Sequence, residues 1–144
     1  MVAYLSQGLG LADVALLVNR IALGFFFAVS GYHKLFVSAR HMALVRTLQN
    51  DRVPFVRVNA WLVPSVEFAG GLAVFAGFYG PLFAALLFTV CIVATCVDGL
   101  NRIRSYQPID KVDWLDDVLY LPEVLYCFMA LVIVLAGPGP LALT

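Results

Sequence analysis

The sequence predicts an all-α membrane protein, folded as an antiparallel bundle of four membrane-spanning helices. Hydrophobic residues make up 62% of the chain and charged residues only 12%, whereas soluble domains are about half apolar and about a quarter charged. The apolar residues fall into four runs, and each approaches the roughly 20 residues that cross a hydrocarbon core. Because backbone polar groups must be paired within lipid, these runs are expected to be helices.

The boundaries of the expected elements follow charges, glycines and prolines along the chain. We expect a single transmembrane domain over residues 1–144, with spans at about 11–36, 58–78, 82–98 and 118–136. The segments 37–57 and 99–117 are expected to be polar loops. Within the first of them we expect a short surface helix, capped by Ser38 and ended near Asn50–Asp51.

The distribution of lysine and arginine predicts the orientation of the chain. Eight of the nine basic residues, counting Lys34, lie in or beside the segments 37–57 and 99–117. The positive-inside rule then places both segments in the cytoplasm and both termini on the non-cytoplasmic side. Trp61 and Trp114 fall near the expected cytoplasmic interface, where aromatic belts lie. The bilayer is the expected surrounding, and a formal net charge of zero gives no argument for a nucleic-acid partner.

One face of the first span is unsuited to lipid. Steps of four and three residues lead from Arg20 through Gly24, Phe27 and Gly31 to Lys34, and such steps return to the same side of a helix. We therefore expect this face to pack against other helices. Small residues allow close helix approach in lipid, and those expected in the second span are Gly70, Gly71 and Gly77.

Arg20 and Glu67 are the charges expected deepest in the membrane. A charge at the bilayer centre costs at least about 2.5–3.5 kcal/mol, so each needs a partner or a water-filled cavity. Counted from the outer ends of consecutive antiparallel spans, Arg20 lies about 13 Å deep and Glu67 about 16 Å deep. We therefore expect an Arg20–Glu67 ion pair. Two roles stay open: the pair holds the bundle together, or the two groups line a polar site for a proton, a quinone head group or a small anion.

A second polar cluster is expected at the cytoplasmic ends of the spans. Lys34 closes the first span, Asp98 closes the third, and Glu123 lies about one turn inside the fourth. We expect Lys34 to pair with Asp98 or Glu123. The alternative is that these side chains extend separately to the lipid head groups.

The sequence offers no self-contained catalytic or metal-binding motif. Cys91, Cys96 and Cys127 fall in apolar runs without a Cys-x-x-Cys pattern, so we interpret them as small core residues and leave a redox role open. His33 and His41 lack acidic neighbours, and no metal site is expected. No phosphate-binding glycine loop, nucleophile elbow, haem, flavin or iron–sulfur pattern is present, so no cofactor is evident in the chain itself.

Three stretches, in this order, resemble the DoxX family of small four-helix membrane proteins. The first is Arg20…Gly24…Phe27…Gly31…Lys34-Leu35, and the second is Val53-Pro54 followed by Glu67 and Gly70-Gly71-Leu72. The third is Leu121-Pro122-Glu123-Val124 with Gly137-Pro138-Gly139. The family often continues with Ser-Leu-Asp, whereas this chain ends Pro-Leu-Ala-Leu-Thr and lacks that acid.

The resemblance implies a multi-pass protein of the bacterial inner membrane and leaves the class of function open. DoxX and DoxD proteins are associated with thiosulfate:quinone oxidoreductases, with oxidative-stress complexes that contain a superoxide dismutase and a sulfurtransferase, and with biosynthetic operons for modified peptides. One hypothesis is therefore a membrane subunit or anchor of a redox-associated complex, accessory to an enzyme and linked to a bound quinone. The other is a non-catalytic assembly or scaffold protein whose cytoplasmic loops dock soluble partners, with a small-molecule carrier as a minor alternative. Other protein subunits or further copies of the chain are the expected partners.

Overall fold

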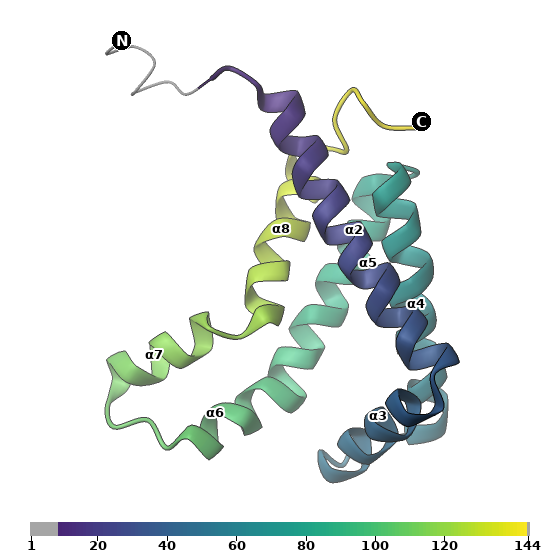
Figure 1. Cartoon of the computed structure of the whole chain (residues 1–144). Helices are drawn as coiled ribbons and strands as arrows, with labels where there is room; N and C mark the ends of the chain where they lie inside the picture. The colour runs from purple at the N-terminus through teal and green to yellow at the C-terminus, as the bar shows by residue number, and fades with distance from the viewer. Residues whose placement is uncertain (1–8, 144) are drawn as a thin grey trace.

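The structure is a computed structural model that describes residues 9–143, and every regular element in this range is a helix (Figure 1). The all-α class is therefore confirmed for the described range. In chain order the helices are α2 (Ala12–Phe36), α3 (Ser38–Asn50), α4 (Val56–Ala76), α5 (Gly80–Ala94), the π-helical turn η1 (Thr95–Gly99), α6 (Leu100–Tyr106), α7 (Lys111–Leu119) and α8 (Pro122–Ala136).

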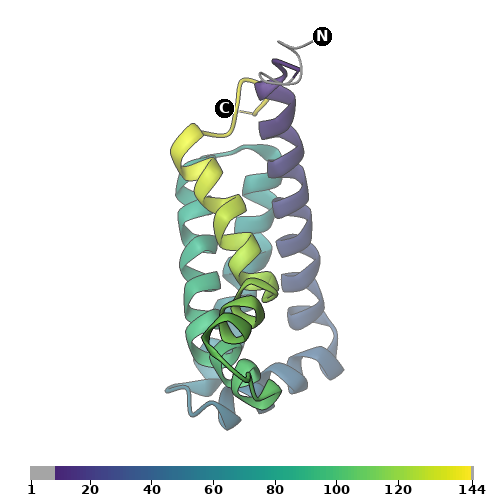
Figure 2. The same cartoon turned by 90° about the vertical axis from the view of Figure 1, so that its left-hand side faces the viewer.

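The bundle has two distinct ends. The start of α2, the α4–α5 turn and the segment after α8 lie at one end, here called the tail end (Figures 1 and 2). Helices α3, α6 and α7 lie at the other, the loop end, where α3 diverges to one side and α6 with α7 to the other (Figure 1). Helix α3 matches the predicted surface helix and ends at Asn50, but Ser38 is its first residue rather than its cap.

Within residues 9–143, three helical stretches are long and apolar enough to cross a membrane. They are α2, α4 and the continuous stretch Gly80–Tyr106, which comprises α5, η1 and α6. A fourth span is obtained only if α7 and α8 are counted together, and these two are bent by 61° at the break between them. These apolar helices support an integral membrane protein, while the side of the membrane on which each end lies remains a prediction.

The segment 99–117, expected as a polar loop, is mostly helical. The third span continues through η1 to the end of α6, and an ion pair between Asp98 and Arg102, four residues apart, stabilises the helix where the apolar run ends. Gln107 then takes a left-handed φ of 55° ahead of Pro108. Because the residue before a proline disfavours the helical conformation, the helix stops there.

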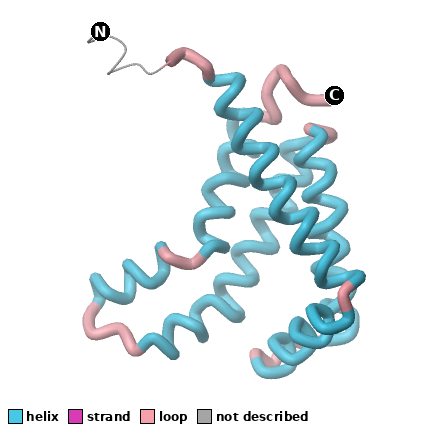
Figure 3. Tube along the Cα trace, viewed as in Figure 1, coloured by secondary structure: helices cyan, strands magenta, loops and turns pink. Residues whose placement is uncertain are grey.

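A break at Pro122 divides the expected fourth span, residues 118–136 (Figure 3). Leu121 has an extended backbone, with φ −67° and ψ 125°, and Pro122 begins α8. Proline disfavours a helical conformation in the preceding residue but suits the first position of a helix. Helix α8 has 15 residues, or about 22 Å at 1.5 Å per residue. It is therefore too short to cross a bilayer core of about 30 Å alone.

The closest contact between helices joins α2 and α4 through three glycines. A Cβ atom at Gly24 would lie 2.5 Å from the backbone nitrogen of Phe75, and one at Gly31 would lie 2.4 Å from that of Phe68. From the other side, a Cβ atom at Gly71 would lie 2.4 Å from a backbone nitrogen of α2. The two backbones therefore touch without side chains between them, as small residues allow in lipid.

The remaining helices complete the bundle around an apolar core. Its buried members are Leu23, Phe27, Val74, Ala84, Leu87, Cys91, Cys127, Ala130 and Ile133. Helix α8 packs mainly on α5. It also meets α2, where the ring of Tyr126 stacks on Phe26 with 4.0 Å between the ring centroids.

Replacing Gly71 by alanine is expected to lower the free energy of unfolding by about 1–3 kcal/mol, because the added methyl group overlaps backbone atoms of α2. Gly70→Ala is the matched control, since its methyl group would meet only the flexible side chain of Leu87, at 3.2 Å. For that variant we expect a change below about 1 kcal/mol. Reversible unfolding in mixed micelles, followed by tryptophan fluorescence, measures both values. Equal stabilities of the two variants would contradict the close α2–α4 contact.

Candidate functional site

Arg20 and Glu67 are the buried charged residues of the described range, but they do not pair with each other. Arg20 is 3% exposed and Glu67 is 4% exposed. Arg20 bonds to the segment after α8, and Glu67 bonds to Lys34. The expected Arg20–Glu67 ion pair is therefore wrong, although each of the two charges has a partner.

The Glu67 carboxylate forms an ion pair with Lys34 through both of its oxygens. Nζ of Lys34 lies 2.8 Å from Oε1 and 2.7 Å from Oε2, and the hydroxyl of Ser30 donates to Oε2 at 3.1 Å. Glu67 lies about 16 Å from the start of α4 and about 13 Å from its end, so the carboxylate is near the middle of that span. The side chain of Lys34 is 30% exposed, and it links the mid-span carboxylate to the edge of the bundle.

Arg20 is held at the tail end by backbone carbonyl groups. Its guanidinium donates to the carbonyl oxygen of Pro138 at 3.1 Å and to that of Leu141 at 2.9 Å. The same segment is fixed to α4, because the N–H of Leu143 donates to the last carbonyl of that helix at 3.0 Å. Gly77 ends α4 with a left-handed φ of 85° and leaves room for the guanidinium, since a Cβ atom there would lie 2.6 Å from Nη1 of Arg20.

Side-chain direction explains why Glu67 pairs with Lys34 rather than Arg20. Side chains on a helix point back toward its N-terminus. Arg20 and Lys34 on α2 therefore point toward the tail end, and Glu67 on the antiparallel α4 points toward the loop end, so only Lys34 and Glu67 converge. Counting residues from the helix ends predicted that Arg20 and Glu67 lie at similar depths in the membrane. In the structure α2 extends beyond the end of α4, and Arg20 therefore lies beside Gly77.

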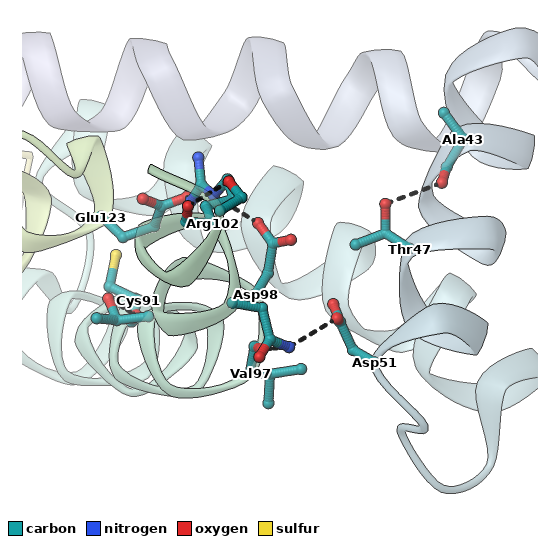
Figure 4. Close-up of polar contacts among 11 residues, drawn as sticks. Ala43, Thr47, Asp51, Cys91, Val97, Asp98, Arg102 and Glu123 are labelled. Carbon is teal, nitrogen blue, oxygen red and sulfur yellow. Dashed lines mark hydrogen bonds and ion pairs between the residues drawn. The ribbon is translucent and has the colours of Figure 1, made fainter. Parts of the chain in front are cut away.

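The loop-end cluster contains Asp98 and Glu123 but not Lys34. Arg102 joins the two carboxylates: its Nη2 donates to Oε1 of Glu123 at 2.6 Å, and its Nε lies 2.9 Å from Oδ2 of Asp98 (Figure 4). The contact with Asp98 is within ion-pair distance but is not aligned as a hydrogen bond. The expected pairing of Lys34 with Asp98 or Glu123 is therefore wrong, because Lys34 is engaged by Glu67.

Sequence reasoning missed Ser30, Arg102 and the tail carbonyls as site groups. Asp98 and Arg102 are four residues apart, a spacing that predicts an ion pair on a helix. Ser30 and Lys34 have the same spacing, which places them on one face beside a single partner. No side-chain pattern points to the carbonyls of Pro138 and Leu141, because any residue supplies such a group.

Glu67 and both Nη atoms of Arg20 have partners within the bundle, whereas Nε of Arg20 is buried without a hydrogen bond to residues 9–143. A separate open space lies elsewhere. A cavity of about 260 Å³ lies between α5 and α8, lined by Phe88, Ile92, Thr95, Val124, Cys127, Phe128 and Leu131. Within residues 9–143, no three His, Cys, Asp or Glu side chains gather as a metal site. The buried charges are therefore best suited to fixing helix positions.

Lys34→Met is expected to lower the free energy of unfolding by about 3 kcal/mol, because it leaves the Glu67 carboxylate buried without its partner. Glu67→Leu alone should cost less, since Lys34 can extend to solvent, and the double variant should recover most of the loss. The control is a second double-mutant cycle, which combines Arg20→Met with Glu67→Leu. In this cycle the losses in unfolding free energy of the two single variants should add to that of the double variant within about 0.5 kcal/mol. Additivity in the Lys34–Glu67 cycle would contradict the ion pair.

Removing residues 138–144 is expected to lower stability by about 3 kcal/mol, because Arg20 is left buried without its acceptors. The same truncation in an Arg20→Met background should cost clearly less. Thermal unfolding in lipid nanodiscs, followed by circular dichroism, compares the four proteins. Equal losses in both backgrounds would show that the segment after α8 does not serve Arg20.

Comparison with known proteins supports the resemblance seen in the sequence. The family model of DoxX matches residues 15–99, a range that contains Arg20, Lys34, Glu67 and Asp98. No curated protein and no solved structure matches the chain. Because the family match covers more than half of the sequence, the chain belongs to the DoxX family.

Proposed function

We propose that this chain is the membrane-embedded anchor subunit of a redox-associated complex, and that a soluble partner protein docks on its loop end. The observation that carries the docking proposal is a basic surface without ion-pair partners among residues 9–143, formed by α3, the segment that joins it to α4 and the first turn of α4. The redox association rests on the family resemblance. A bacterial inner membrane, with the loop end in the cytoplasm, is part of the same proposal.

The basic surface consists of four exposed arginines, Arg40, Arg46, Arg52 and Arg57. None of them forms an ion pair with a carboxylate of residues 9–143. The acidic residue of the segment, Asp51, instead accepts a hydrogen bond from Asn101 at 2.9 Å. Charge complementarity supplies specificity and speed in protein association, so an acidic surface on a soluble protein is the partner that fits.

An exposed aromatic residue stands within this basic surface. Phe55 is 81% exposed, and its φ of 53° is left-handed, as is the φ of 55° at Arg52. This conformation is strained for residues with a β-carbon, and Asn59 stabilises the loop by donating to the carbonyl of Pro54 at 2.7 Å. Backbone strain of this kind clusters at functional sites, and aromatic and arginine side chains dominate binding energy at protein interfaces. Phe55 is therefore the expected centre of the interface.

Helix α7 offers a second surface of opposite charge at the loop end. Its residues Asp113, Asp116 and Asp117 share one helix face by their spacing. No residue of α7 is buried, and the exposed apolar side chains of Val112 and Leu115 suit the boundary between head groups and acyl chains. An acidic face turned to water is therefore available to a basic partner.

Catalysis by the deep charges of the bundle is the weaker alternative. A quinone head group needs hydrogen-bonding groups that are not already engaged. Both oxygens of Glu67 face Lys34. Arg20 donates to two carbonyls, which leaves its buried Nε as the one donor of that side chain without a partner among residues 9–143. This geometry supports a structural role for both residues.

A photo-crosslinking amino acid at Phe55, introduced in native membranes, tests the docking proposal. We expect an adduct with a soluble protein whose acidic surface is identified by mass spectrometry. Its yield should fall at least about tenfold when Arg52 and Arg57 are both changed to glutamine, and it should fall with added salt. The matched control is Arg104→Gln, which replaces an exposed arginine of α6 and should leave the crosslinking yield unchanged.

Two outcomes would count against this proposal. An adduct with the mass of a phospholipid would identify the basic surface as a head-group site instead. A protein adduct whose yield depends on neither arginine nor on salt would show that charge does not select the partner.

A further inference from the structure

We propose that Cys91 and Cys127 form an intramembrane dithiol that is oxidised to a disulfide by a lipid-soluble acceptor of two electrons and two protons, of the quinone class. This inference rests on the redox part of the proposed function and gives it a location in the chain. It replaces the view of these two cysteines as small core residues, and it stands on four observations: their juxtaposition, their burial, an adjoining cavity and a neighbouring carboxylate.

The packing of α5 against α8 brings the two thiols together. Gly80 near the start of α5 lies against Pro138, and Gly99 at the other end of the stretch lies against Leu121. This antiparallel register places Cys91 opposite Cys127, and both side chains belong to the same buried cluster. Two thiols that face each other across one helix interface can form a disulfide, whereas a lone cysteine offers only single-thiol chemistry.

Burial decides which oxidants reach the pair. Cys91 is 2% exposed and Cys127 is 8% exposed, and both lie in the apolar core. Cys127 also lines the cavity of about 260 Å³ between α5 and α8, whose other walls are apolar side chains and Thr95. An ionic oxidant would have to shed its hydration to enter such a site. A flat, apolar molecule dissolved in the membrane would not.

Glu123 is placed to accept a proton from the dithiol. It precedes Cys127 by four residues, so the two share a face of α8, and Cys127 is buried where α8 packs against α5. Oε1 of Glu123 accepts from Arg102 at 2.6 Å. Oε2 is buried and accepts no hydrogen bond from residues 9–143. A buried carboxylate oxygen without a donor, one helical turn from Cys127, fits the role of a base.

The oxidation is balanced within these groups. Cys91 and Cys127 each lose the proton of the S–H bond, and together they give up two electrons as one S–S bond forms. Both electrons and two protons end on the acceptor, which leaves as the hydroquinone, and Glu123 relays a thiol proton. The new bond joins α5 to α8 across the core. It would therefore stabilise the α5–α8 half of the bundle by a covalent link, whereas the α2–α4 half is held by close glycine contacts.

The test uses the full chain with Cys96→Ser, reconstituted in nanodiscs without oxygen, and decylubiquinone as the probe. We expect intact-mass analysis after denaturation and maleimide labelling to show both thiols free before the quinone is added and neither afterwards, with one hydroquinone formed per disulfide. Cys91→Ala and Cys127→Ala should each abolish hydroquinone formation. Glu123→Gln should slow disulfide formation about tenfold or more. Asp98→Asn, which removes the other partner of Arg102, should change the rate less than about twofold.

The proposal is overturned if both thiols still take up maleimide after exposure to the quinone while the chain retains its native circular dichroism. It is equally overturned if Cys91→Ala leaves hydroquinone formation intact. Equal slowing by Glu123→Gln and Asp98→Asn would remove the base role of Glu123. The crosslink at Phe55 needs no thiol, and the thiol assay needs no partner protein, so this inference and the docking proposal fail independently.

Discussion

The contact between the backbones of α2 and α4 sets the positions of the charged groups in this bundle. Three glycines, Gly24, Gly31 and Gly71, bring the two helices so close that no β-carbon fits between them. Such a contact permits little sliding, because each glycine lies against backbone atoms of the other helix. The register that follows brings Lys34 to Glu67 and leaves Arg20 at the end of α4. Electrostatics then stabilises a register that packing has already selected.

The two halves of the bundle are stabilised by different means, and this difference separates the proposed functions. The α2–α4 half has the glycine contact and the Lys34–Glu67 pair. The basic surface around Phe55 adjoins this half at the loop end. The α5–α8 half has a short, broken last helix and a cavity beside Cys127. The proposed docking surface therefore lies on the first half and the proposed thiol chemistry in the second, and we expect a partner to bind in either redox state of the thiols.

Periodicity in the sequence was enough to identify the buried face of the first span, because Arg20, Gly24, Phe27 and Gly31 share one side of any helix and all are buried. The partners of its charges depend on the register between helices, which depth counting could not supply. The acceptors of Arg20 are backbone carbonyls, and these leave no trace in a side-chain pattern. The break at Pro122 was readable, since proline restricts the residue before it, but the apolar run around it favoured one continuous span.

We conclude that the deep charges of this DoxX protein have structural partners, with Lys34 bound to Glu67. Dipolar-coupling measurements by solid-state NMR on the protein in lipid test it directly. The chain contains two lysines and two glutamates, so labelling lysine Nζ and glutamate carboxyl carbons gives few signals to assign, and a second sample carries labelled arginine guanidinium nitrogens in place of lysine. A strong lysine–glutamate coupling that disappears in Lys34→Met is the predicted result. A coupling from the Arg20 guanidinium to Glu67, with none from lysine, would contradict the claim.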